Sequence, residues 1–86
     1  MVESRFKVGD DILAAFRFVQ IQEIFIGPDG KTWIRAWWPA VATDDEFESN
    51  RKLEEKGFKV YYYGEDRGEA VWNHGIVEGP EELFLN

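Results

Sequence analysis

Cysteine is absent from the 86 residues of this chain. Without thiols the chain can form neither a disulfide framework nor a thiolate metal site, and the absence favours a reducing compartment. Long apolar runs are absent as well, because no stretch approaches the roughly 20 residues that span a bilayer. Charges at Glu3, Arg5, Lys7, Asp10 and Asp11 interrupt any signal-peptide pattern. We therefore expect an intracellular protein without a membrane partner.

Side chains for catalysis are also scarce. The chain has one histidine, His74, and its only serines and threonines are Ser4, Ser49, Thr32 and Thr43. No pairing of a nucleophile with a base can be recognised among them. His74 precedes a glycine, which is typical of a turn or surface position. We do not expect an enzyme.

Motifs for metals and phosphates are missing too. Neither Asp10 with Asp11 nor the acidic run at residues 44–48 has the alternating spacing and the glycine of a calcium loop. No glycine-rich phosphate-binding loop occurs. The sequence therefore predicts neither a metal nor a cofactor.

Aromatic residues, in contrast, are abundant. They make up 16% of the chain, within a hydrophobic share of 44%. Each ring removes a large area from water when it is buried, so even a short chain of this kind can fold around one core. We predict a single domain over residues 1–86.

The formal net charge of −7 is unevenly distributed. Residues 1–43 hold five acids and five bases, whereas residues 44–86 hold twelve acids and five bases. A negative field repels phosphate backbones and favours basic partners, so direct binding of nucleic acid is not expected. The acidity can equally serve to keep an aromatic-rich domain in solution.

Alternating apolar and polar residues indicate a mainly β chain. Residues 27–30, Gly-Pro-Asp-Gly, have the composition of a hairpin turn. A slip in the alternation near Gln22 and Glu23 predicts a β-bulge. Pro39 is expected to end the strand before it, because it offers no donor to a ladder. The expected strands lie within residues 6–16 and at 18–26, 32–38, 58–63, 70–72 and 76–77, with a break at His74 and Gly75.

One helix is predicted near residues 44–56. Thr43 can cap it, Glu46 stands at the capping-box position, and acids gather in the first turn with lysines late in the segment. Only Phe47 and Leu53 are large and apolar there, which indicates a mostly exposed helix inserted between strands.

The adjacent aromatics are the most informative pattern. Neighbours in a strand point to opposite faces, so Trp37 and Trp38 cannot share one core, and the same holds within residues 61–63. One interpretation is a two-sided sheet or a barrel covered by the helix. The other is that the outer rings line a groove or cage for a cation or a peptide.

Four segments, at residues 6–13, 19–25, 29–38 and 82–85, together resemble the bromo-adjacent homology (BAH) domain, a β-rich chromatin module. They are similar to its opening strand, its central hairpin running into a tryptophan, and a late strand. The resemblance implies binding to histone tails, nucleosomes or other proteins, and hence a nuclear location; otherwise we expect the cytoplasm. Trp38 is followed by residues 39–42, Pro-Ala-Val-Ala, where the family carries an aromatic residue, an Arg-Pro pair and acids.

The fold class predicted from these patterns is a small, mainly β, SH3-like or BAH-like partly open barrel. It should contain about five to six antiparallel strands and the inserted helix. A related Tudor-like barrel would share the opening pattern. The family has a further strand beyond the one that residues 82–85 resemble. Without it, a sheet edge would stay open to a partner strand or to a second copy, and the second case would give a homodimer.

The leading functional hypothesis is a non-enzymatic module that binds a basic peptide or protein through aromatic contacts and an acidic field. The residues predicted to bind are Trp37, Trp38, Tyr61, Tyr63, Trp72, Glu65, Asp66 and Glu69.

A small acidic inhibitor, of the type that phages produce, is the alternative. In that case a line of carboxylates imitates nucleic-acid phosphates and blocks a nucleic-acid-binding protein. The carboxylates concerned are those of Asp44, Asp45, Glu46, Glu48, Glu54 and Glu55.

Overall fold

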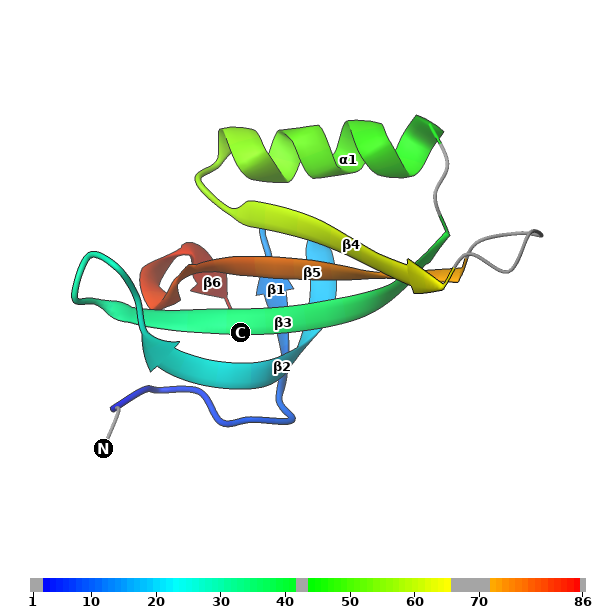
Figure 1. Ribbon diagram of the computed structural model, residues 1–86. Coiled ribbons are helices and arrows are strands. Elements are labelled where there is room, and N and C mark those ends of the chain that lie inside the picture. The colour runs from blue at the N-terminus through cyan, green and yellow to red at the C-terminus, as the bar shows by residue number, and fades with distance from the viewer. Residues whose placement is uncertain (1–2, 42–43, 66–71, 86) are drawn as a thin grey trace.

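The computed structural model describes residues 3–41, 44–65 and 72–85, and Figure 1 shows their arrangement. Six strands, one α-helix and a short 3-10 helix follow each other along the chain. The elements are β1 (Asp11–Ala14), β2 (Arg17–Ile26), β3 (Thr32–Val41), α1 (Asp44–Glu55), β4 (Lys59–Glu65), β5 (Trp72–Pro80), η1 (Glu81–Leu83) and β6 (Phe84–Leu85).

The strands form one antiparallel sheet in the order β4-β5-β3-β2-β1-β6. This confirms the predicted class, a mainly β fold of five to six antiparallel strands with one helix inserted near residues 44–56. The sheet is not closed into a barrel, because β4 and β6 stay unpaired to each other and form its two edges.

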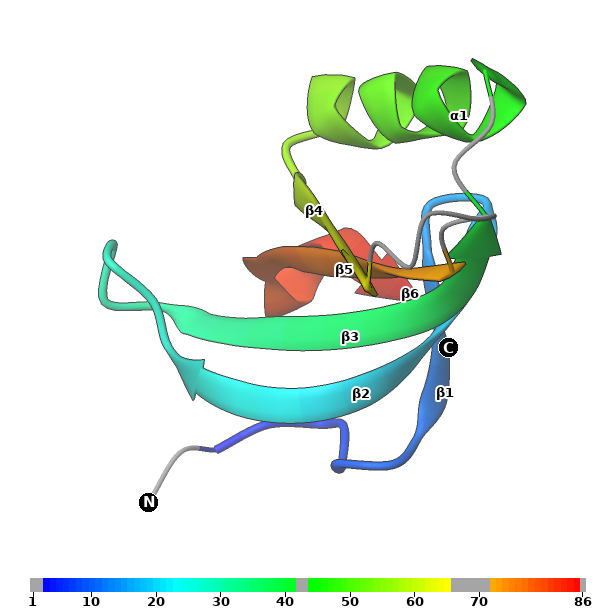
Figure 2. The same cartoon turned by 45° about the vertical axis from the view of Figure 1, so that its right-hand side comes forward.

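The sheet curves strongly, and Figure 2 shows β1 and β2 turning out of the plane of β3. The curvature brings the two edges together through side chains. Phe58, which directly precedes β4, meets Phe84 of β6 with ring centroids 5.1 Å apart in an edge-to-face arrangement. Aromatic packing between the edges thus takes the place of the backbone ladder that a closed barrel would have.

The core lies on the inner face of the curved sheet, beneath α1. Along β3 the alternation places Ile34, Ala36 and Trp38 on this face, and all three are buried. Residues from other strands, from α1 and from the segments before β1 and β4 complete the same cluster. Its remaining members are Phe6, Ile12, Ala14, Val19, Ile21, Leu53, Phe58, Val77 and Phe84.

Two predicted strand boundaries are wrong. Pro39 lies inside β3 and pairs with His74, and β5 runs without a break through His74 and Gly75. The β2 ladder reaches β3 only as far as Trp37, so near Pro39 the strand pairs with β5 alone. A proline is tolerated where a strand is paired on one side only.

Gly75 fits the middle of a strand because a ring covers it. A Cβ added there would lie 2.2 Å from Cζ2 of Trp38, so the indole rests on bare backbone. A larger residue would push the ring out of the core.

The predicted turn and bulge are both confirmed. The register of β2 against β3 shifts between Ile21 and Glu23. In the turn, Asp29 Oδ1 accepts hydrogen bonds from the Lys31 backbone N–H (3.0 Å) and from Trp33 Nε1 (2.8 Å). The Lys31 N–H is the main cause that lowers the pKa of the Asp29 carboxyl; desolvation opposes it, and the Trp33 indole adds to the lowering.

Glu46 fixes the first turn of α1 to the sheet. Its carboxylate accepts a hydrogen bond from Trp38 Nε1 (2.7 Å) and pairs with both terminal nitrogens of Arg17 (3.2 Å each). The Arg17 guanidinium also stacks 4.7 Å from the centre of the Trp38 ring. One carboxylate therefore joins α1, β2 and β3 in a largely buried network, where charge-assisted bonds are strong.

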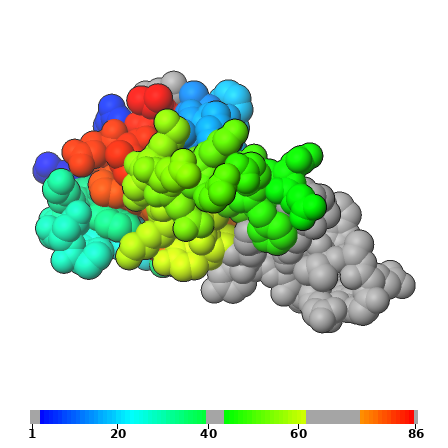
Figure 3. All heavy atoms as spheres, turned by 90° about the horizontal axis from the view of Figure 1, so that it is seen from above, coloured from blue at the N-terminus to red at the C-terminus, as the bar shows by residue number. Residues whose placement is uncertain are grey.

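The rest of α1 packs more sparsely. Figure 3, which looks down on the helix, shows it beside β4, with the atoms of residues near the C-terminus on its other side. Leu53 is fully buried, whereas Phe47 is half exposed. Asn50 is only 3% exposed, yet neither its Oδ1 nor its Nδ2 has a hydrogen-bond partner among the described residues. An apolar residue at that position would avoid the desolvation of an amide.

Candidate binding groove on the outer face of the sheet

A row of side chains crosses the outer face of the sheet. Trp37 on β3 pairs with Gln20 on β2 and with Ile76 on β5, and Ile76 pairs with Tyr61 on β4. Because residues paired across strands share a face, the register places two aromatic rings on either side of one aliphatic residue. Two strand spacings separate the aromatic residues, about 10 Å.

A charged row runs beside the aromatic one. Arg35 Nη1 donates to Glu23 Oε2 (2.9 Å) and Arg35 Nη2 donates to Glu78 Oε2 (3.2 Å). Lys59, which pairs with Glu78, continues the row and places its Nζ 5.3 Å from the centre of the Trp33 ring. The charges alternate in sign from β2 to β4, so this row is close to neutral as a whole.

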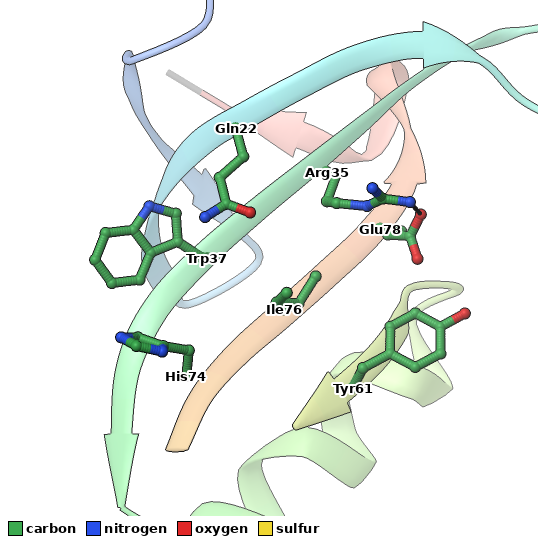
Figure 4. Close-up of a pocket in the computed structure, with 7 residues that line it drawn as sticks. All are labelled: Gln22, Arg35, Trp37, Tyr61, His74, Ile76 and Glu78. Carbon is green, nitrogen blue, oxygen red and sulfur yellow. Dashed lines mark hydrogen bonds and ion pairs between the residues drawn. The ribbon is translucent and has the colours of Figure 1, made fainter. Parts of the chain in front are cut away.

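Between these rows lies a groove of about 800 Å³ that opens to solvent (Figure 4). Figure 4 shows Trp37 and His74 at one end and Arg35 with Glu78 at the other. Ile76 lies between the Trp37–His74 pair and Tyr61. Such a volume lies within the usual range of ligand pockets. The groove is lined by Gln22, Arg35, Trp37, Tyr61, His74, Ile76 and Glu78.

The Trp37 ring is held in place by two neighbours. Its Nε1 donates to Gln20 Oε1 (3.2 Å), and its ring meets the His74 ring edge to face with centroids 5.1 Å apart. A ring that is already oriented loses little rotamer freedom when a ligand arrives. Tyr61, at the other side, keeps 46% of its surface exposed.

The predicted binding residues divide into three groups. Trp37 and Tyr61 come together in the groove. Trp38 does not belong to this surface, because it is only 4% exposed and points into the core. The other predicted residues include no side chain that the structure describes. Tyr63, Glu65 and Trp72 have described backbones in β4 and β5, while Asp66 and Glu69 lie outside the described residues.

Sequence reasoning missed most of the remaining lining residues. Arg35 shares a face with Trp37 by simple alternation, so a signal for it was present. Ile76, Glu78 and His74 could be assigned only after β5 was paired with β3, and α1 and β4 separate these strands in the sequence. His74, expected in a turn or at the surface, is an exposed strand residue that contacts Trp37.

The acids of α1 do not form one uninterrupted row. Glu46 turns inward to Arg17 and Trp38, and Glu48 pairs with Arg51. Asp44, Asp45, Glu54 and Glu55 are exposed, but they lie at opposite ends of the helix.

In the part of the chain that the structure describes, no helix is long and apolar enough to cross a membrane. Likewise, residues 3–41, 44–65 and 72–85 contain no group of three or more acidic, histidine or cysteine side chains placed to hold a metal ion.

Comparisons with known proteins do not identify a family. No protein-family model matches the chain, and searches of curated proteins and of solved structures find no match. Function is therefore inferred from the residues and geometry of this chain.

Proposed function

We propose that the chain is a non-enzymatic binding module whose outer groove receives a basic peptide or a basic segment of another protein. The observation that carries this proposal is the row of Trp37, Ile76 and Tyr61 on the solvent side of the sheet. Folding alone does not require two aromatic side chains on the face that lies away from the core.

The chemistry of the row suits a lysine or an arginine. The aliphatic stem of such a side chain would lie on Ile76, and its cationic head would approach the Trp37 or Tyr61 ring. Glu78 lines the groove and Glu23 pairs with the lining residue Arg35, although Arg35 already neutralises part of their charge. The net charge of −7 adds a long-range attraction that raises the association rate.

The resemblance to BAH domains gives the proposal its most specific form. A BAH-like module would act inside the cell on a histone tail or another chromatin protein. Glu65, Asp66, Glu69, Tyr63 and Trp72 remain predicted contributors to this surface, and pairing of two copies through an open sheet edge remains a prediction. The nucleic-acid-mimic alternative is less well supported, because Glu46 and Glu48 are engaged within the chain.

The test is a titration of the ¹⁵N-labelled chain with a short lysine- and arginine-rich peptide, followed by NMR chemical shifts. We expect the largest shifts at Trp37, Tyr61 and Ile76, including the Trp37 indole N–H. Tyr61→Ala should weaken the affinity about tenfold, the size of a desolvated cation–π contact. The affinity should also fall as salt is added.

Ile26→Ala is the matched control, because Ile26 is 57% exposed at the far end of β2 and does not line the groove. It should bind the peptide as tightly as the parent chain. Equal affinities for the parent and Tyr61→Ala, or shifts spread evenly over the acidic surface, would contradict the proposal.

A further inference from the structure

A second exposed aromatic surface lies at the tip of the β1–β2 hairpin. Phe18 is 74% exposed and Phe16 is 50% exposed. They border a hollow of about 460 Å³ that is open to solvent, and among the described residues its lining does not overlap with that of the groove. The hollow is lined by Phe16, Arg17, Phe18, Trp38, Pro39 and Ser49.

The two-residue loop that carries Phe16 lacks the residue types that favour a tight hairpin turn. Ala14 pairs with Arg17, so Ala15 and Phe16 form a two-residue loop. Ala15 has φ +57°, the left-handed region, and is the sole non-glycine residue with positive φ among those described. Hairpin loops of this length usually take glycine, asparagine or aspartate there. The turn therefore stores some backbone strain at Ala15 and leaves the adjacent Phe16 half exposed.

The tip lies against the acidic start of α1. Arg17, between the two phenylalanines in the sequence, pairs with Glu46, and in Figure 3 the blue atoms of the hairpin region lie next to the green atoms of α1. Asp44 and Asp45 are exposed on the same helical turn. Residues 44–46 and 48 are four acids, and the two bases paired with members of this group are Arg17 and Arg51. The net charge of these six side chains is −2.

The exposed area of the two phenylalanines and the local negative charge together indicate which kind of partner fits this surface. Phe16 and Phe18 leave about 250 Å² of ring surface exposed, taking about 200 Å² for a whole side chain. A stable interface between two folded proteins needs about 800 Å² on each side. A second copy would also bring the same negative charge to the contact. The surface therefore fits a short segment that carries a large apolar side chain next to a lysine or an arginine.

We propose that the hairpin tip is a second docking site, which binds a basic segment of another protein through an apolar anchor seated against Phe16 and Phe18. The cation beside that anchor pairs with Asp44 or Asp45. Among the described residues, this site and the outer groove have different linings, so we treat them as separate sites.

The experiment uses the full ¹⁵N-labelled chain and three short synthetic peptides, made of leucine with lysine, leucine with glutamate, and serine with lysine. We expect only the leucine–lysine peptide to shift the amide signals of Ala15, Phe16 and Phe18. Phe18→Ser should weaken its affinity about tenfold, the effect of withdrawing most of one phenylalanine contact. Ile26→Ser removes a comparable exposed apolar side chain at the other end of β2 and should leave the affinity unchanged.

Charge is tested with two double variants of equal net charge. Asp44→Asn with Asp45→Asn should weaken the affinity about threefold, and Glu54→Gln with Glu55→Gln should leave it unchanged. The proposal is overturned if Phe18→Ser and Ile26→Ser bind equally well. It is also overturned if the chain instead associates with itself in a manner that Phe18→Ser abolishes. The chemical-shift changes at the hairpin should persist in Tyr61→Ala. Failure of the groove proposal and failure of the hairpin-tip proposal therefore give different results.

Discussion

Trp37 and Trp38 are neighbours in the same strand, yet they lie in different environments. Trp38 lies in the core, on Gly75, with its indole N–H bound to Glu46. Trp37 lies on the outer face, where Gln20 and His74 orient it beside an open groove. Identical side chains one residue apart thus stabilise the fold on one face and offer contact area on the other. Some aromatic side chains of this chain therefore form the core, and others remain on the surface, where folding does not use them.

The inner face should be sensitive to added volume. In Gly75→Ala the new methyl group would overlap the Trp38 ring, and we expect a loss of about 3 kcal/mol in the free energy of unfolding. Urea denaturation measures the loss. In the background of Trp38→Leu the same substitution should cost much less, because the ring that it meets is gone. A full loss in both backgrounds would mean that the ring does not lie on Gly75.

Loss of the Glu46 contacts between α1 and the inner face should cause the next largest loss of stability. Glu46→Ala leaves the Trp38 indole N–H and the Arg17 guanidinium without their acceptor, and we expect a loss of about 2 kcal/mol. Glu48→Ala is the control on the same helix, since the exposed Glu48–Arg51 pair is worth less than about 0.5 kcal/mol. If both variants unfold at the same urea concentration, the network does not hold the helix.

A substitution at Asn50 should change the stability in the opposite direction. Its buried amide has no hydrogen-bond partner among the described residues, so Asn50→Leu should raise the free energy of unfolding by about 1 kcal/mol. Peptide binding in the groove should not change. Destabilisation by Asn50→Leu would show that the amide is bonded in the folded chain.

The smallest effect concerns Asp29 at the β2–β3 turn. Its pKa in the folded chain is lowered below the ordinary value of 3.8 by the Lys31 N–H, so its stabilising contribution is present above that value and is lost as the pH falls through the folded pKa. Asp29→Asn should therefore differ from the parent chain at neutral pH and converge with it in acid. Urea midpoints measured from neutral pH down to strongly acidic pH would show this, and a constant difference would contradict it.

Much of the fold could be predicted from local patterns. The hairpin turn at residues 27–30, the bulge at Gln22 and Glu23, and the helix near residues 44–56 each have a local chemical signature, and all three are present. The predictions at Pro39 and Gly75 are wrong because whether a strand tolerates these residues depends on neighbours in space. A one-sided ladder accommodates the first, and the Trp38 ring covers the second.

The candidate groove could be predicted only in part. Alternation placed Trp37 and Trp38 on opposite faces, but it could not say which face was the core. That choice depends on Gly75 and Glu46, which reach Trp38 from β5 and α1. The lining residues His74, Ile76 and Glu78 arrive through a long-range strand pairing that leaves no local pattern.

The central claim is tested most directly by measuring Trp37→Leu and Trp38→Leu side by side, for both urea stability and affinity for the lysine- and arginine-rich peptide. We predict that Trp38→Leu loses about 3 kcal/mol of stability while its folded form still binds the peptide. Trp37→Leu should keep its stability within about 1 kcal/mol and lose at least about tenfold in affinity. Unchanged binding by Trp37→Leu, together with a stability loss as large as that of Trp38→Leu, would show that both faces of β3 serve the fold alone.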